Sequence, residues 1–231
     1  IMPQDGYGRT CQCKLCKGKG TPERGRLGSM SDYVWSYVER VARTVYTSHP
    51  DKNVSCFSYG TYTLPPESID RLSPNLVVGM VHGRGKNYPR KPAVYRLRNT
   101  RESVTEVRNG WLERSNNDLL IWEHYVFTHR HFRGPVYFPH AISRGLKSLK
   151  GDCIGELVEL PFGPWEVRHH GLHAPGFNHL NVYVTARLYW DADRDVDALL
   201  EEYYNKFYGP AAKEMKAFIG YAEANWHDLR E

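Results

Sequence analysis

The sequence lacks several features that would point to common classes of protein. Among its 231 residues no apolar run approaches the length needed to cross a bilayer, so we expect no membrane span. It also lacks internal repeats and low-complexity tracts. The net charge is only +5, and the basic residues gather in 9–26 and 84–101 rather than along one helix face. We therefore expect no nucleic-acid partner.

What the sequence does contain is a recurring pattern, in which a short apolar run is followed by an amphipathic helical stretch. Four such runs can be read: Asn53–Tyr62, Asn75–His82, Asp118–Val126 and Cys153–Pro161. Strands that alternate with helices indicate βαβ units and a parallel sheet. The sequence thus predicts an α/β fold of the TIM-barrel type, with about four to five units of a (β/α)8 barrel.

The predicted helices are bounded by capping and punctuating residues. Ser31 and Asp32 are expected to cap a helix that runs to Ser48, and Gly209-Pro210 separates the last two helices. We assign residues 1–177 to the barrel and 178–231 to trailing helices packed on it. The other predicted helices cover residues 100–114, 138–149, 178–190, 195–208 and 210–229.

The number of units is too small for a closed barrel of eight strands. The chain also opens on Ile1 rather than on Met, and Ile1–Gly6 reads like a strand that enters a loop. We therefore expect the chain to be the C-terminal half of a barrel whose upstream half is missing. Its open sheet edges would then favour self-association.

Carboxylates at the ends of the predicted strands are the candidates for catalysis. Glu123 ends an apolar strand, where burial of a carboxylate lowers the stability of the fold unless the group is paired. A carboxylate at such a position is therefore either paired or retained for function. A buried ion pair is the alternative for Glu123, and an Asx-turn is the alternative for Asp5. Glu156 and Glu159 share the last strand on opposite faces, and Glu159 lies nearer its end. We predict that Glu123, Asp5 and Glu159 supply the acid and the base or nucleophile of glycoside hydrolysis.

Aromatic residues are abundant, with sixteen Tyr and six Trp. Because the C–H face of a pyranose stacks well on flat apolar rings, some of these residues are candidates for sugar binding and others for the core. Arg84 has the geometry to grip a uronic acid, although a solvated loop would explain it equally well. We expect no cofactor. The predicted substrate-binding residues are Tyr59, Tyr62, His82, Arg84, Trp122, His124, Tyr125, Glu156 and Trp165.

Histidines offer an alternative chemistry, that of a metal-dependent hydrolase. Thr128–His131 contains an H-x-H pattern like that of barrel metallohydrolases, which activate water with a divalent ion. The pattern lies beyond the predicted strand, and no third and fourth ligands have matching spacing. The histidines that crowd the loops after the last two strands are His124, His129, His131, His169, His170 and His173.

Cys11, Cys13 and Cys16 form a C-x-C-x2-C pattern in a loop rich in Gly and Lys. Three thiolates this close can hold a structural zinc ion with a fourth ligand from elsewhere, or form a local disulfide and leave a spare thiol. No second C-x2-C or His pair accompanies them. Either arrangement would tie down the loop rather than perform chemistry. Cys56 and Cys153 are predicted to be buried small hydrophobes.

Several segments together resemble the DUF4838 family, and the resemblance runs over nearly the whole chain. Its more specific parts are the C-x-C-x2-C pattern and the segment Phe207–Ala212. The remaining parts are Asp5-Gly6, Phe57–Tyr62 with Pro65-Pro66, Pro74–Leu76, Trp122–Tyr125 and Leu188–Asp191.

The resemblance implies a large bacterial protein similar to (β/α)8 glycoside hydrolases of the α-glucuronidase and β-hexosaminidase groups. It implies secretion or a periplasmic location and polysaccharide substrates. By position, Asp5 would match the fourth strand and Glu123 the seventh. The tandem acidic pair of the hexosaminidase group is missing, because Gly6 follows Asp5. This argues against a substrate-assisted mechanism.

The sequence therefore predicts a glycoside hydrolase that takes part in polysaccharide degradation. The alternatives are a carbohydrate-binding barrel without catalysis and a hydrolase that uses the loop histidines to bind a metal.

Overall fold

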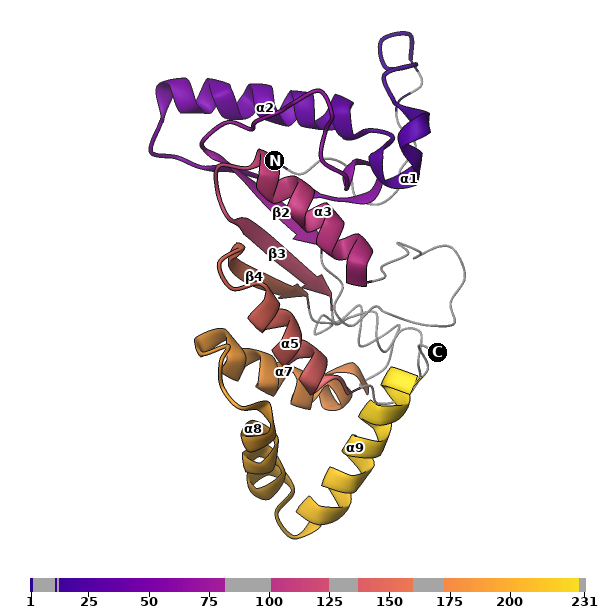
Figure 1. The fold of residues 1–231 in the computed structure, drawn as a ribbon, viewed down its shortest axis with the longest axis vertical. Coiled ribbons are helices and arrows are strands. Elements are labelled where there is room, and N and C mark those ends of the chain that lie inside the picture. The colour runs from indigo at the N-terminus through magenta and orange to yellow at the C-terminus, as the bar shows by residue number, and fades with distance from the viewer. Residues whose placement is uncertain (2–10, 12, 82–100, 125–136, 160–172, 229–231) are drawn as a thin grey trace. The chain divides into compact units, whose positions relative to one another are not determined.

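The computed structural model describes residues 1, 11, 13–81, 101–124, 137–159 and 173–228 (Figure 1). The chain divides into two compact units. The first unit comprises residues 1–82, 97–122 and 151–157, and the second comprises residues 83–96, 123–150 and 158–231. The expected division between residues 177 and 178 falls inside a single helix, which runs from His173 to Trp190.

The described strands and helices follow the predicted order, with bounds that differ from the prediction by a few residues. Among them, η3 is a π-helical turn. The elements are η1 Pro22–Arg24, α1 Gly25–Gly28, α2 Ser31–Ser48, β1 Val54–Ser58, η2 Gly60–Tyr62, β2 Leu76–Val81, α3 Arg101–Arg114, β3 Leu119–His124, α5 Pro139–Ser148, β4 Cys153–Glu159, α7 His173–Trp190, α8 Val196–Tyr203, η3 Tyr204–Tyr208, η4 Gly209–Ala211 and α9 Ala212–Asp228.

The strands form one parallel sheet in the order β1-β2-β3-β4, which confirms the predicted α/β fold with a partial barrel-type sheet. In β1 and β2, Val54 pairs with Leu76 and Ser58 with Met80. In β2 and β3, Val81 pairs with Trp122. Because spatial order equals chain order, each strand is added beside the previous one, as in a run of βα units.

The two faces of this sheet differ in burial. Cys56, Val78 and Ile121 share one face and are completely buried. Phe57 and Trp122 lie on the other face and are only partly buried. Since side chains alternate along a strand, the pattern assigns the buried face to the covering helices α2 and α3. The prediction of a buried Cys56 is thereby confirmed, whereas Cys153 at the start of β4 is partly exposed.

Two tryptophans join α2 to α3. The rings of Trp35 and Trp111 lie 4.4 Å apart between centroids, and both side chains are fully buried. Their indole N–H groups donate hydrogen bonds of 3.0 Å to consecutive carbonyls, those of Tyr62 and Thr63. Through these two hydrogen bonds the pair connects the end of η2 to both helices.

The predicted cap at the start of α2 is wrong. The residue before the helix is Met30, and no side chain caps it. Asp32 instead accepts the backbone N–H of Ser68 at 2.7 Å and pairs with Arg24 at 2.8 Å. Burial raises the pKa of Asp32, but the hydrogen bonds from Ser68 and the charge of Arg24 outweigh burial and hold the pKa below its usual value. The carboxylate of Asp32, which was expected to cap the helix, therefore binds Ser68 and Arg24 instead.

The second unit packs α5, α7, α8 and α9 around an apolar core. Fully or almost fully buried members come from every one of these helices, among them Ile142, Val184, Leu199 and Ile219. Asp195 caps α8 by accepting the backbone N–H groups of Asp197 and Ala198. In the part of the chain that the structure describes, no helix is long and apolar enough to cross a membrane.

A histidine links three of these helices. The Nδ1 of His140 in α5 lies 2.7 Å from the buried carboxylate of Glu223 in α9. Its Nε2 lies 3.2 Å from Asp197 in α8. The hydrogen bond to Glu223, opposed by burial and reinforced by the charges of Glu223 and Asp197, raises the pKa of His140 to about 9.

Replacement of Trp111 by Phe tests the tryptophan pair. The substitution leaves the buried carbonyl of Thr63 without its donor, so we expect the free energy of unfolding to fall by about 1–3 kcal/mol. Urea denaturation measures this. Tyr37→Phe, at a half-exposed ring on α2, is the matched control and should change the free energy by less than about 0.5 kcal/mol. Equal stabilities of the two variants would contradict the assigned role.

The link made by His140 predicts a specific pH dependence. Because its folded pKa lies above the unfolded value of about 6.5, its stabilisation is complete below that value and is lost as the pH rises through about 9. After allowance for solvent screening, we expect wild type to exceed His140→Gln by about 1–2 kcal/mol at pH 6. Unfolding curves from pH 6 to 10 should show the difference shrinking. His49→Gln, at an exposed histidine, should follow wild type throughout; a constant difference for His140→Gln would refute the link.

Candidate functional site

Three aromatic rings meet on the partly exposed face of the sheet, at the carboxyl ends of β1 and β3. Tyr59 and Trp122 stack with their ring centroids 6.0 Å apart and their planes inclined by 21°. Phe57 meets Trp122 edge-on at 5.0 Å. All three side chains are partly buried. We call these residues the ring cluster.

The register of the sheet explains how the ring cluster forms. Phe57 is level with Gly79 in the neighbouring strand, and Val81 is level with Trp122. A Cβ atom on Gly79 would lie 2.3 Å from the ring of Phe57. The absence of a side chain at Gly79 therefore lets the Phe57 ring lean across β2 toward Trp122.

Sequence reasoning selected Tyr59 and Trp122 but missed Phe57 and Gly79. A glycine inside the apolar strand Leu76–Val81 was the available signal, because such a glycine often marks a place where another group approaches closely. Which group approaches depends on the register between strands. The sequence of one strand does not contain that information.

Glu123 occupies the other face of β3. Because side chains alternate along a strand, Glu123 shares a face with Ile121 and not with Trp122. Its side chain is completely buried. The structure therefore brings Tyr59 and Trp122 together on one face of the sheet and places Glu123 on the opposite face. The catalytic role of Glu123 stays a prediction.

The other predicted site residues are placed as follows. Tyr62 lies in η2 and is 5% exposed, so its side chain belongs to the core. Glu156 lies in β4 and is partly exposed. The backbones of His124 and Glu159 end β3 and β4, but their side chains are not described. Those outside the described residues are Asp5, His82, Arg84, Tyr125 and Trp165, together with the loop histidines His129, His131, His169 and His170.

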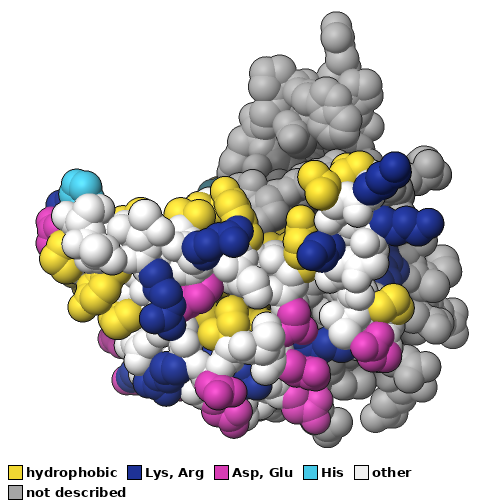
Figure 2. All heavy atoms as spheres, turned by 90° about the horizontal axis from the view of Figure 1, so that it is seen from above, with side chains coloured by type: hydrophobic (Ala, Val, Ile, Leu, Met, Phe, Trp, Pro, Cys, Tyr) yellow, Lys and Arg dark blue, Asp and Glu magenta, His cyan; other side chains and the backbone are white. Residues whose placement is uncertain are grey.

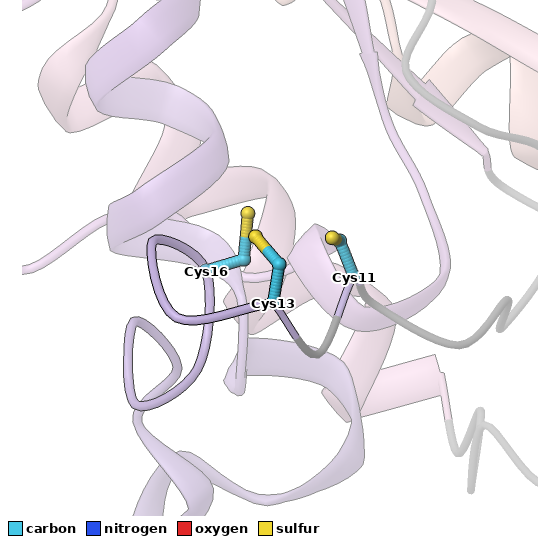
Figure 3. A group of neighbouring side chains, drawn as sticks. All are labelled: Cys11, Cys13 and Cys16. Carbon is cyan, nitrogen blue, oxygen red and sulfur yellow. The ribbon is translucent and has the colours of Figure 1, made fainter.

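A second candidate site is formed by the sulfur atoms of Cys11, Cys13 and Cys16, which we call the sulfur cluster. All three atoms lie within 4.8 Å of one another. Figure 3 shows the sulfurs of Cys13 and Cys16 next to each other and that of Cys11 turned toward them. A hydrogen bond from Cys11, followed by those from the backbones of Leu15 and Cys16, lowers the pKa of Cys13 to about 7. Among the described residues this is the one group of His, Cys, Asp or Glu with the spacing of metal ligands.

The surface of α2 gives no comparable site. A shallow groove runs along this helix and shares no residue with the ring cluster. It is lined by Ser36, Glu39, Arg40, Arg43, Thr44, Thr47 and Ile69. Arg43 is paired with Glu39 at 2.6 Å. Figure 2 shows basic and acidic side chains interspersed on this face, so the face carries no patch of a single charge.

Gly79→Ala tests the origin of the ring cluster. The added methyl group would collide with the ring of Phe57, and we expect the free energy of unfolding to fall by about 1–3 kcal/mol. Gly155→Ala in β4 is the matched control, because no atom lies within 4 Å of the added Cβ.

A double-mutant cycle makes this test specific. If the collision with Phe57 causes the loss, Gly79→Ala should cost less in a Phe57→Ala background, with a coupling of about 0.5–3 kcal/mol in urea denaturation. Additive effects of the two substitutions would contradict the packing described here.

The family model described as "Domain of unknown function (DUF4838)" matches residues 2–220. No curated protein and no solved structure matches the chain.

Proposed function

The chain belongs to the DUF4838 family, and we propose that it is a glycoside hydrolase of the barrel type whose ring cluster binds a pyranose. One observation carries this proposal: a partly exposed pair of stacked rings, Tyr59 and Trp122, at the carboxyl ends of parallel strands. Ligands of parallel α/β folds bind at that edge of the sheet.

The chemistry of the ring cluster suits a sugar better than a charged ligand. Phe57 contributes no polar atom, Tyr59 combines a flat apolar ring with one hydroxyl group, and Trp122 adds a flat ring whose nitrogen is buried. A pyranose presents the same combination, with an apolar C–H face and hydroxyl groups at its edge. The rings are held by packing on one another before any ligand arrives, which reduces the entropy lost on binding.

Under this proposal the acid–base chemistry falls to strand-end carboxylates, with Glu123 as the first candidate. A buried carboxyl group is typical of the general acid in glycoside hydrolysis. Asp5 and Glu159 are the proposed partners. Polysaccharide substrates, a uronic acid among the sugars, a secreted or periplasmic location and an upstream half of the barrel belong to the same proposal.

A second function is favoured by one specific observation. Glu123 lies on the face of β3 opposite to Trp122, so the strand itself separates the two side chains. A carbohydrate-binding barrel without catalysis would need only the ring cluster, and Glu123 would then serve the fold.

The two functions are separated by substitutions at adjacent residues. Trp122→Ala removes the stacking surface and should weaken binding of an oligosaccharide at least about tenfold, whereas Trp122→Phe should retain most of it. Glu123→Gln should lower the rate of sugar release by about 10²–10⁴-fold while binding persists. Calorimetry with a panel of neutral and uronic oligosaccharides measures binding, and reducing-end assays measure release.

Matched controls are Tyr37→Ala, an exposed ring on α2, and Glu106→Gln, an exposed carboxylate on α3. Unchanged binding by Trp122→Ala would refute the ring cluster as the sugar site. Binding by wild type and Glu123→Gln alike, with no release by either protein, would establish the binding barrel. Thermal melting of each variant separates loss of function from loss of fold.

A further inference from the structure

The loop that carries the sulfur cluster has no apolar core of its own. In the described stretch from residue 13 to residue 20, no side chain is buried. Leu15, its one large apolar residue, is 82% exposed. Ordering a loop costs conformational entropy of about 1–2 kcal/mol per residue, and burial of apolar surface does not offset it here. Something else must hold this loop in one conformation.

The backbone of the loop brings two of the sulfurs together. The N–H groups of Cys16 and Lys17 donate to the carbonyl of Cys13, at 3.0 Å and 2.9 Å. The N–H groups of Leu15 and Cys16 also face the sulfur of Cys13. A turn of this kind presents both cysteines of a C-x2-C pair on one side of the loop.

The third sulfur and a tyrosine complete the arrangement. Cys11 lies on the other side of a single intervening residue, and its sulfur joins the other two within 4.8 Å. The phenol group of Tyr33 in α2 lies close enough to the sulfur of Cys16 for each group to influence the other. The sulfur cluster is thereby connected to the first long helix of the fold.

We propose that Cys11, Cys13 and Cys16 bind a zinc ion through their three sulfur atoms. Thiolates are soft ligands that select zinc over hard cations. Zn–S bonds of about 2.3 Å in a tetrahedron separate the sulfurs by about 3.8 Å. The observed spacing of up to 4.8 Å therefore needs only a small contraction.

The charge of the loop fits this ion. Three thiolates exceed the charge of Zn²⁺ by one, and the exposed lysines Lys14, Lys17 and Lys19 surround the loop with positive charge. Within the described residues no fourth His, Cys, Asp or Glu joins the cluster.

Zinc content tests the proposal directly. The full chain is purified under reducing conditions, loaded with zinc and dialysed, and its metal is counted by mass spectrometry. We expect one zinc ion in wild type and in Cys153→Ser, whose thiol lies outside the loop. Cys11→Ser, Cys13→Ser and Cys16→Ser should each bind zinc more than 100-fold more weakly, beyond the ~10–100-fold typical of losing an outer-shell partner. Cobalt substitution should give thiolate charge-transfer absorption in wild type and in Cys153→Ser, but not in the three loop variants.

Tryptic cleavage in the loop gives a second readout, which does not depend on stable folding of the variants. A chelator should accelerate cleavage after Lys14, Lys17 and Lys19 in wild type and in Cys153→Ser, and should have no effect in the loop variants. Two results would overturn the proposal: reduced wild-type protein that takes up no zinc, or uptake that is unchanged in Cys13→Ser. A Cys13–Cys16 disulfide in protein that binds no zinc after reduction would assign the cluster to redox chemistry instead.

Discussion

The two indole hydrogen bonds of Trp35 and Trp111 are the constraint on which the first unit depends. Both rings are buried against each other between α2 and α3, where an indole N–H without an acceptor would cost free energy. Each finds its acceptor in the backbone at the end of η2, at Tyr62 and Thr63. This fixes the path of the chain as it leaves β1, and with it the position of Tyr59, which precedes η2. The core of the helices and the aromatic end of the strand are therefore one connected piece of structure.

Alternation along the strands then decides which chemistry each face can offer. The side chains of Cys56, Val78 and Ile121 are buried on one face of the sheet, and Glu123 lies on the same face. The opposite face has rings at its strand ends and Gly79 at the position where a side chain would keep those rings apart. A single glycine in the central strand thus converts a row of separate aromatic residues into a cluster. The catalytic hypothesis and the binding hypothesis assign function to different faces of the same strand, and this is why adjacent residues can separate them.

The elements of this fold were accessible from the sequence because their causes are local. Helical spacing in Ser31–Ser48 and the apolar run Leu76–Val81 determine type and approximate bounds without reference to any other segment. The predictions failed where a residue distant in the sequence determines what a side chain contacts. Asp32 has the chemistry of a cap, but Arg24 and Ser68 turn it elsewhere. The period of two predicts correctly that Trp122 and Glu123 diverge, but not that Phe57 reaches Trp122, because that contact depends on the register across β2.

The ring cluster and the sulfur cluster are preorganised in different ways, and this difference bears on what each can bind. The rings are fixed by a packed sheet and by neighbouring side chains, so a ligand would bind there without ordering the site. It would stabilise the fold only by the amount that its affinity supplies. The sulfurs lie on a loop in which no side chain from residue 13 to residue 20 is buried, and a few backbone hydrogen bonds hold this loop. A ligand that joins the three sulfurs would supply the energy that the loop lacks, so that binding and folding of the loop become one event.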